Sequence, residues 1–344
     1  MKAAVYHRYG APEVVTLADV PTPTPRANEV LIRIRATTVT TSDWRARSLS
    51  MPAGFGLLGR IVFGVFGPRK SILGTELSGT VEAIGSAVTR FAVGDDVFAF
   101  SGARYGCHAE YRTFAEDGLI AKKPMRSSFE EAAALSFGGT TALSFLRDKA
   151  SIAKGERVLV VGASGGVGTA AVQIAKHFGA EVIGVCSRSN VDLVRSLGAD
   201  SVIDYEREDF AAARAAYDII LDTTSTASLA RCEASLRPGG RLVIVHGTFA
   251  QAIGMERPAK ASGKRVIGGV AAVKPEHLRF LGSLAETGEL RPVIDRTFSF
   301  DRVAEAHAVV DSGRKRGNVV MTVSRASAKE NAPRARATAF TAIA

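Results

Sequence analysis

The residues best suited to hold a phosphate group lie at 158–168, where the sequence reads Val-Leu-Val-Val-Gly-Ala-Ser-Gly-Gly-Val-Gly. The four aliphatic residues predict a strand buried on both faces, and residues 169–176 predict a helix. A helix N-terminus presents unpaired backbone N–H groups and the positive end of the helix dipole. The turn is therefore suited to the pyrophosphate of a dinucleotide. Its candidate contacts are Gly162, Ala163, Ser164, Gly165, Gly166 and Val167.

The glycine spacing departs from the usual dinucleotide pattern. Gly162, Gly165 and Gly168 are three residues apart, so the turn reads G-x-x-G-G-x-G in place of G-x-G-x-x-G. A turn that merely allows close packing is the alternative interpretation. The apolar run at 182–185 favours the nucleotide site, because it supplies the second parallel strand of a right-handed crossover.

The end of that second strand bears on which cofactor the turn holds. NAD sites place an acidic residue there for the ribose 2′-hydroxyl, whereas a 2′-phosphate needs cationic or hydroxyl donors. Residues 186–190 read Cys-Ser-Arg-Ser-Asn, and no carboxylate occurs before Asp192. This favours NADP(H), with Ser187 and Arg188 on the phosphate. The alternative is that Arg188 is a solvated surface residue.

The elements that position these residues follow from the pattern around them. Residues 151–296 alternate strand and helix, which predicts an α/β domain with a doubly wound parallel sheet. Its expected strands cover 157–161, 181–185, 201–203, 218–221, 241–245 and 265–270. Residues 1–127 instead show short strands between glycine and proline turns, typical of partly closed β-structure. A strand-like run at 319–323 indicates that the chain returns to this first domain, and residues 326–344 are expected to be a disordered tail.

Length and composition bound the class of protein. The chain has 344 residues, 46% of them hydrophobic, which suffices for two domains with sizeable cores. The net charge of +10 is spread thinly and is not interleaved with aromatic residues, so nucleic acid is not the expected partner. Three scattered cysteines fit neither a disulfide framework nor metal pairs and indicate a reducing compartment. No leader-like segment and no apolar run of about 20 residues is found, so we expect a cytoplasmic protein without a membrane span.

Residues 51–73 form an unusual apolar segment, interrupted by glycines and by the cations Arg60, Arg69 and Lys70. A membrane-contacting loop is one interpretation. The preferred interpretation is a lid or wall of an apolar substrate pocket with some core packing, because the run is short and broken by glycine.

Three groups of residues make the chain similar to the zinc-independent, quinone-oxidoreductase-like branch of the medium-chain dehydrogenase/reductase superfamily. They are Met1-Lys2-Ala3 with prolines at 21, 23 and 25; the blocks Gly-Thr-Glu-Leu-Ser-Gly-Thr-Val at 74–81 and Val-Gly-Asp-Asp-Val at 93–97; and the turn 162–168 followed by 197–205. The resemblance covers residues 1–323. It implies a GroES-like substrate domain (1–127 plus 297–325) around a Rossmann domain (128–296), with the active site in the cleft between them.

The resemblance also implies roles for individual residues. It places the substrate near Thr40, Asp43 and Trp44, with Thr141 at the cleft beside the nicotinamide. Helix capping for Asp43 and core packing for Trp44 are the alternatives. Further positions beside the cofactor match Tyr205, Gly247 and Asn318. His246 is expected behind the reacting groups rather than as a general acid, and a homodimer through an edge strand of the Rossmann sheet is implied.

The same resemblance bears on zinc, which needs three protein ligands at a catalytic site. Thr41 and Thr75 stand where zinc-dependent relatives have a cysteine and a histidine, and the sequence lacks four closely spaced cysteines for a structural zinc. We therefore expect no metal. Without a Lewis acid, the favoured reaction is hydride transfer to a small apolar acceptor, a quinone or an α,β-unsaturated carbonyl, whose anion delocalises onto oxygen. The alternatives are a zinc-free acyl or enoyl reductase of lipid or polyketide metabolism, and a non-catalytic NADP(H)-binding sensor or RNA-associated protein.

Overall fold

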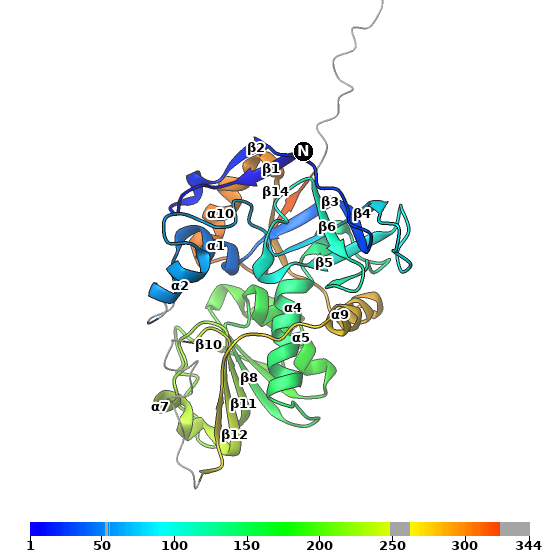
Figure 1. Ribbon diagram of the computed structural model, residues 1–344. Coiled ribbons are helices and arrows are strands. Elements are labelled where there is room, and N and C mark those ends of the chain that lie inside the picture. The colour runs from blue at the N-terminus through cyan, green and yellow to red at the C-terminus, as the bar shows by residue number, and fades with distance from the viewer. Residues whose placement is uncertain (52–53, 55, 248–261, 324–344) are drawn as a thin grey trace, which may run out of the picture.

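A computed structural model describes the whole chain except residues 52–53, 55, 248–261 and 324–344. The chain folds into two lobes, one above the other in Figure 1, each built around its own sheet. The tail predicted at 326–344 lies outside the described residues.

The lower lobe is a doubly wound parallel sheet, which confirms the predicted fold class. Its strands lie in the order β10-β9-β8-β11-β12-β13, and every neighbouring pair is parallel, as in a Rossmann fold. The strand bounds are β8 (Arg157–Val161), β9 (Glu181–Cys186), β10 (Ser201–Asp204), β11 (Tyr217–Asp222), β12 (Leu236–Ile244) and β13 (Arg265–Ile267). All six predicted strands are present, although β12 begins earlier and β13 ends earlier than expected.

Strand β8 shows why an unbroken aliphatic run forms the centre of this sheet. Val158 and Val160 pack on one face with helices α4 (Ser136–Leu143), α5 (Gly166–His177) and α9 (Pro275–Thr287). Leu159 and Val161 face the opposite core, which includes helix α7 (Leu229–Cys232). Because both faces are covered from Val158 to Val161, these four positions have no room for a solvated polar side chain.

The upper lobe is mostly β-structure and is built from both ends of the chain. Strand β1 (Lys2–Val5) pairs with β2 (Thr16–Asp19), and a seven-stranded sheet has the order β14-β15-β3-β4-β5-β7, with β6 paired to β3. The bounds are β3 (Glu29–Val39), β4 (Glu76–Ile84), β5 (Asp96–Phe100), β6 (Tyr111–Ala115), β7 (Ile120–Lys122), β14 (Ile294–Ser299) and β15 (Asn318–Thr322). β15 runs antiparallel to β3, so the chain returns to its first lobe as predicted.

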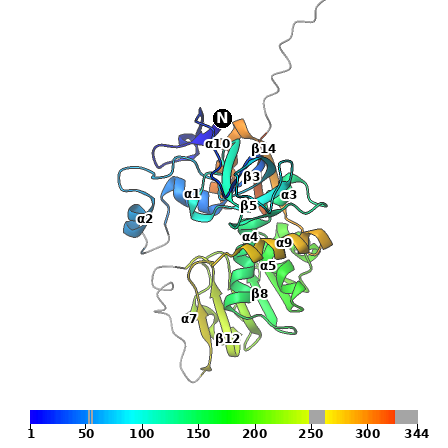
Figure 2. The same cartoon turned by 45° about the vertical axis from the view of Figure 1, so that its right-hand side comes forward.

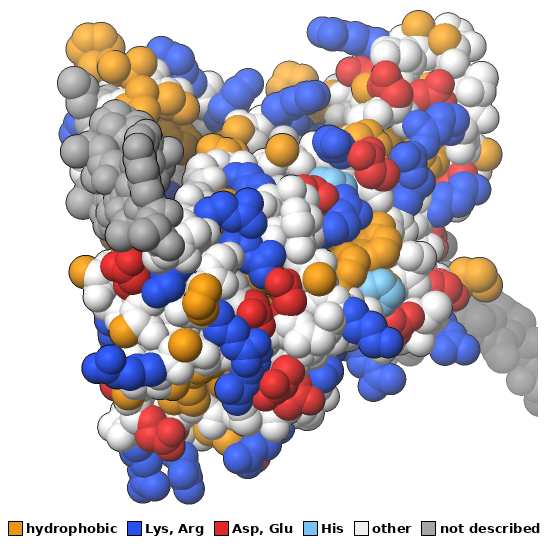
Figure 3. All heavy atoms as spheres, turned by 90° about the horizontal axis from the view of Figure 1, so that it is seen from below, with side chains coloured by type: hydrophobic (Ala, Val, Ile, Leu, Met, Phe, Trp, Pro, Cys, Tyr) orange, Lys and Arg blue, Asp and Glu red, His pale blue; other side chains and the backbone are white. Residues whose placement is uncertain are grey.

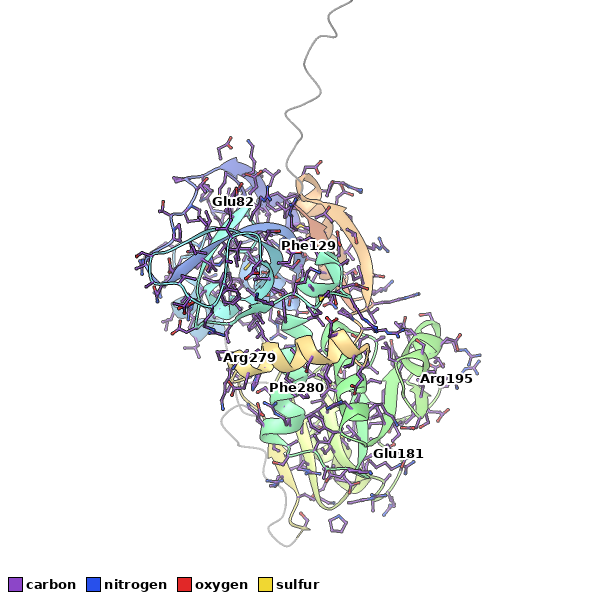
Figure 4. All side chains as sticks on the ribbon, turned by 90° about the vertical axis from the view of Figure 1, so that its right-hand side faces the viewer. Glu82, Phe129, Glu181, Arg195, Arg279 and Phe280 are labelled. Atoms are coloured by element: carbon purple, nitrogen blue, oxygen red, sulfur yellow. The ribbon has the colours of Figure 1, made fainter. Side chains whose placement is uncertain are left out.

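The boundary between the lobes differs from the predicted one in two places. Helix α3 (Phe129–Ala133) lies in the stretch assigned to the Rossmann domain, yet Figure 4 shows Phe129 beside the upper lobe. Small apolar residues fix it there in one buried cluster: Ala36, Ala133, Ala134 and Val320. Strand β14 begins at Ile294 rather than after residue 296, because Ile294 pairs with Asn318 of β15.

The remaining helices are α1 (Thr41–Ser48), α2 (Gly56–Phe63), α6 (Val191–Ser196) and α10 (Val303–Asp311). Helix α2 stands away from the body of the upper lobe, at the left of Figures 1 and 2. In the described part of the chain, every helix is too short or too polar to cross a bilayer.

Candidate functional site

The glycine turn joins β8 to α5 and leaves the start of that helix open to a cleft. Gly162 adopts a φ of +81°, which glycine takes easily, and its N–H donates to the Val185 carbonyl at 3.1 Å. A Cβ on Gly168 would lie 2.0 Å from the Gly162 carbonyl oxygen, so glycine there lets the helix pack close to the strand. Gly165 and Gly166 line the cleft, so the first N–H groups of α5 are accessible to an anion.

The C-terminal part of the upper lobe reaches over this turn. The N–H of Gly317 donates to the Ser164 carbonyl at 2.8 Å. A Cβ on Gly166 would lie 3.2 Å from both Asn318 Oδ1 and Lys315 Nζ. The start of α5 is thus a cradle that a side chain would fill, with an amide and an amine at its edge.

Lys315 is a site residue that the sequence did not reveal, because Arg314-Lys315-Arg316 has the pattern of a solvated basic triplet. All three side chains line the cleft. Lys315 Nζ donates to the Gly317 carbonyl. Burial lowers the pKa of Lys315 to about 8, and the charge of Glu76 acts in the opposite direction. A phosphate beside this desolvated amine would stabilise its charged form.

The residues predicted for the 2′-phosphate lie together at the carboxyl ends of β9 and β10. Ser187, Arg188 and Tyr205 all line the cleft. Arg188 is exposed, and none of the ion pairs found among the described residues involves it, so its guanidinium is available to a ligand. Ser187 Oγ accepts from Asn190 Nδ2 at 3.0 Å, which fixes the hydroxyl. Glu206 lines the same cleft and places one exposed carboxylate there.

On the opposite wall, Thr40 and Asp43 are joined in a capping box at the start of α1. Asp43 Oδ2 accepts from the Thr40 N–H at 2.7 Å and from Thr40 Oγ1 at 2.6 Å. Asp43 Oδ1 accepts from the Gly74 N–H at 2.7 Å. Asp43 is completely buried and does not line the cleft, so the catalytic role expected for it is not supported. Its carboxylate caps the start of α1, which was the alternative role, and the Thr40 hydroxyl takes part in the same hydrogen bonds.

Thr41 and Trp44 face the cleft next to Thr40. No hydrogen bond within the described part of the chain uses the Thr41 hydroxyl, so it can donate to a ligand. Trp44 lines the cleft and also packs against the core of the upper lobe. Trp44 therefore packs in the core and is also in a position to contact a substrate in the cleft.

Thr141 is not among the residues that line the cleft, so its place beside the nicotinamide stays a prediction. Its Oγ1 donates to the Phe137 carbonyl at 2.7 Å within α4, and Phe137 lines the cleft in its place. The Phe137 N–H donates to the carboxyl of Glu76, which also accepts from Thr38 Oγ1 at 2.5 Å. Burial raises the pKa of Glu76 to about 8 against these two hydrogen bonds. Glu76 thus ties the start of α4 to the upper sheet.

The lobes together enclose a cleft of about 1220 Å³, larger than a pocket for one small ligand. Eleven predicted site residues line it: Thr40, Trp44, Gly162, Ser164, Gly165, Gly166, Val167, Ser187, Arg188, Tyr205 and Asn318. Four others do not: Asp43, Thr141, Ala163 and Gly247. Ala163 points into the core, and its N–H donates to the Val185 carbonyl at 2.9 Å. The sequence analysis missed Phe210, Thr223, Thr224 and Arg231, of which the two threonines directly follow β11.

Two further expectations concern the rim of the cleft. His246 lines the cleft after β12, and burial lowers its pKa to about 4, with the charge of Arg45 acting in the same direction. A neutral imidazole is a hydrogen-bond donor rather than a strong acid at neutral pH, in keeping with the limited role expected for it. None of the described residues in the segment 51–73 lines the cleft, while Phe63 and Leu73 pack in the core of the upper lobe. A lid or pocket wall formed by this segment stays a prediction.

The residues at the candidate zinc positions do not fit that metal. Thr41 and Thr75 offer hydroxyls, which are poor zinc ligands, and Glu76 is held by Thr38 and Phe137. Within the described residues, no three His, Cys, Asp or Glu side chains come together as a metal site. Independence from zinc stays a prediction.

Comparisons with known proteins agree with this architecture. Residues 26–124 match the alcohol dehydrogenase GroES-like domain family, and residues 197–321 match the zinc-binding dehydrogenase family. The chain is 33% identical over 333 residues to the 2-methylene-furan-3-one reductase of Solanum lycopersicum, covering 93% of this chain and 79% of the relative. It is 30% identical over 336 residues to a chloroplastic NADPH-dependent alkenal/one oxidoreductase of Arabidopsis thaliana, with the same coverage of 93% and 79%.

Among solved structures, that of the quinone oxidoreductase from Coxiella burnetii superposes with a TM-score of 0.81 at 30% identity, covering 94% of this chain and 99% of the other. The superposition covers both lobes, and the identity to these relatives extends over more than nine-tenths of this chain. The chain therefore belongs to the medium-chain dehydrogenase/reductase superfamily, in its quinone-oxidoreductase-like branch, and is an oxidoreductase with a nicotinamide cofactor.

Proposed function

We propose that this chain reduces quinones or α,β-unsaturated carbonyls with NADPH and without a metal. One observation carries the proposal: the open N-terminus of α5 and the wall formed by Thr41 and Trp44 belong to one cleft. A dinucleotide on the first and an apolar acceptor against the second would lie side by side. Bound NADPH supplies the hydride, and the chain's contribution is to position both molecules.

The residues around the cradle suit the diphosphate of such a cofactor. The N–H groups at the start of α5 and the Lys315 amine offer donors and positive charge from two sides. The neighbouring Arg314 and Arg316 add further positive charge to the cleft.

Support for NADPH over NADH comes from the ends of β9 and β10. Ser187 offers a hydroxyl, and Arg188 offers a guanidinium that forms no ion pair with the described residues; both suit a 2′-phosphate. Glu206 in the same cleft acts against an anion, so the preference rests on the balance between it and Arg188. The name of the Arabidopsis relative, an NADPH-dependent oxidoreductase, agrees with this choice.

On the acceptor side, the Thr41 hydroxyl is our candidate donor to a carbonyl or quinone oxygen. Adding a hydride places negative charge on that oxygen, and a hydrogen bond there stabilises the charge. The proton that completes the reduction comes from water, which reaches the open cleft. Trp44 and Phe137 supply apolar surface beside this hydroxyl.

The names of the relatives also favour this class of acceptor. A furanone reductase, an alkenal/one oxidoreductase and a quinone oxidoreductase all carry conjugated carbonyl compounds in their names. The solved enoyl reductase CurK is only 24% identical to this chain, so it shows a shared fold and does not favour the acyl or enoyl reductase alternative. A homodimer through an edge strand and a cytoplasmic location stay predictions; β10 and β13 are the edges concerned.

The test is oxidation of NADPH by the purified protein with a panel of quinones, enones and enals. We expect turnover of at least one of these classes, and elemental analysis without stoichiometric zinc. Thr41→Val should lower kcat with enones more than it raises KM, while Thr41→Ser should keep most of the activity. Absence of turnover above background across the panel would refute the proposal, and stoichiometric zinc would refute its metal-free form.

A further inference from the structure

The segment 58–66, formed by most of α2 and the loop after it, exposes an unusual amount of apolar surface. Eleven large hydrophobic side chains are exposed among the described residues, and five of them fall within this segment: Leu58, Ile61, Val62, Val65 and Phe66. Phe66 is fully exposed, and Ile61, Val62 and Val65 are at least half exposed. Figure 3 shows hydrophobic side chains gathered at the upper left of the molecule, on the side where α2 projects in Figure 1.

The segment is held to the upper lobe from one side, which leaves its apolar side chains facing outward. The Tyr9 hydroxyl donates to the Gly64 carbonyl at 2.8 Å. The Phe63 ring packs against Tyr105 with a centroid distance of 6.4 Å. Since the segment also takes no part in lining the cleft, neither the core nor the substrate site accounts for the exposed side chains.

The sequence on either side of this apolar patch carries positive charge and no negative charge. Residues 44–75 contain no Asp or Glu. Arg60, Arg69 and Lys70 are exposed, and none of the ion pairs among the described residues uses them. Burial raises the pKa of Tyr9, and the charges of Arg60 and Arg69 act against that rise, so both cations lie close to the anchor of the segment.

We propose that the segment 58–70 docks the protein on an anionic lipid surface. Apolar side chains beside unpaired Lys and Arg are what an interfacial helix needs to enter the headgroup region of a bilayer. A second copy of the chain fits less well, because a symmetric contact would set the same cations against each other. Docking would bring the cleft close to acceptors dissolved in the bilayer, and this last point rests on the proposed function.

The first experiment is sedimentation with vesicles of phosphatidylcholine, with and without phosphatidylglycerol. We expect the wild type to bind the anionic vesicles. The double variants Val62→Ser/Phe66→Ser and Arg69→Glu/Lys70→Glu should each bind them at least tenfold more weakly than the wild type. The matched controls, Val93→Ser/Met125→Ser and Arg195→Glu/Arg214→Glu, alter exposed residues elsewhere and should bind like the wild type. Higher salt should weaken binding of the wild type.

Two outcomes would overturn the proposal. One is wild-type protein that does not sediment with anionic vesicles, or that sediments equally well after Val62→Ser/Phe66→Ser. The other is a dimer in light scattering that the same double substitution converts to monomer, which would assign the patch to a second copy. Circular dichroism of each variant establishes that it is folded.

Activity separates this inference from the proposed function. With a water-soluble quinone, Val62→Ser/Phe66→Ser should turn over NADPH at the wild-type rate, because the segment does not line the cleft. With a long-chain quinone embedded in anionic vesicles, the same variant should be at least fivefold slower. Equal rates in vesicles would refute the coupling of docking to substrate supply, whereas inactivity of the wild type on every acceptor would refute only the proposed function.

Discussion

Replacing Arg188 by alanine tests the NADPH preference directly. Arg188 follows β9, is exposed and lines the cleft, and no ion pair found within the described residues depends on it. Removing its side chain should therefore change the free energy of unfolding by less than about 0.5 kcal/mol, as at other exposed sites. An effect on cofactor affinity can then be ascribed to the lost contact with the ligand.

The expected size follows from the exposure of the guanidinium. A hydrogen bond to a charged group contributes about 1.5–3 kcal/mol. Water competes for an exposed group, so the lower end, about 1.5 kcal/mol, is the appropriate value. That corresponds to about a tenfold increase in the Kd for NADPH at 25 °C. NADH lacks the 2′-phosphate, so Arg188→Ala removes no hydrogen bond to it. The Kd for NADH should therefore rise less than about twofold.

The assay is titration of cofactor fluorescence with NADPH and NADH at fixed ionic strength. Arg188→Lys keeps the charge but not the planar fork, so its Kd for NADPH should fall between those of the wild type and Arg188→Ala. Arg195→Ala is the matched control: Arg195 is exposed, lies on α6 in the same lobe and is outside the cleft lining (Figure 4). Equal losses for NADPH and NADH on Arg188→Ala, or a wild type that prefers NADH, would refute the assignment.

Three further predictions concern the cradle and its surroundings. Gly168→Ala should destabilise the fold by about 1–3 kcal/mol in chemical denaturation, because its Cβ would meet the Gly162 carbonyl at 2.0 Å. Gly165→Ala, whose Cβ would be 3.5 Å from the same oxygen, should keep the stability and weaken cofactor binding; loss of stability in both alike would contradict this. For Lys315, with its pKa lowered to about 8 by burial, a bound phosphate favours the charged amine. NADPH affinity should therefore fall as pH rises above 8 in the wild type but stay flat in Lys315→Met, as measured by calorimetry. Burial raises the pKa of Glu76 to about 8, above an unfolded value of about 4.3. Its stabilising contribution is present below the unfolded pKa and is lost as pH rises through 8, so Glu76→Gln should flatten the fall in unfolding free energy between pH 5 and 8.

Much of the Rossmann lobe could be predicted because its signals are local. A buried parallel strand such as β8 needs an unbroken aliphatic run, and the turn after it needs glycine where the helix approaches the strand at Gly168. Arg188 could be predicted beside the cofactor from the residues that follow the second strand, and Tyr205 from the family resemblance; both line the cleft at the ends of β9 and β10. Each of these inferences depends on a few adjacent residues.

The wall opposite the cradle depends largely on contacts between distant parts of the chain. The roles expected there from the sequence were therefore less reliable than those in the Rossmann lobe. Asp43 has the residue type of a catalytic acid, but its partner Gly74 lies 31 residues away, and this bond, with those to Thr40, gives the carboxylate a structural role. Thr141 is directed into α4 by the Phe137 carbonyl. The triplet Arg314-Lys315-Arg316 reaches the cleft because β15 pairs with β3. The residues of the triplet and its neighbours do not by themselves predict this pairing.

The two chain ends also explain why the cofactor site belongs to both lobes. The start of α5 is supplied by the lower lobe, whereas Lys315 and Asn318 come from the upper lobe and meet it at Gly166. The bond from the Gly317 N–H to the Ser164 carbonyl already joins the two sides without a ligand. A diphosphate on the cradle would contact both lobes at once, and a ligand that binds only the joined form stabilises the joint by its binding free energy. The return of the chain to its first sheet thus links the cleft wall at Thr41 and Trp44 to the start of α5.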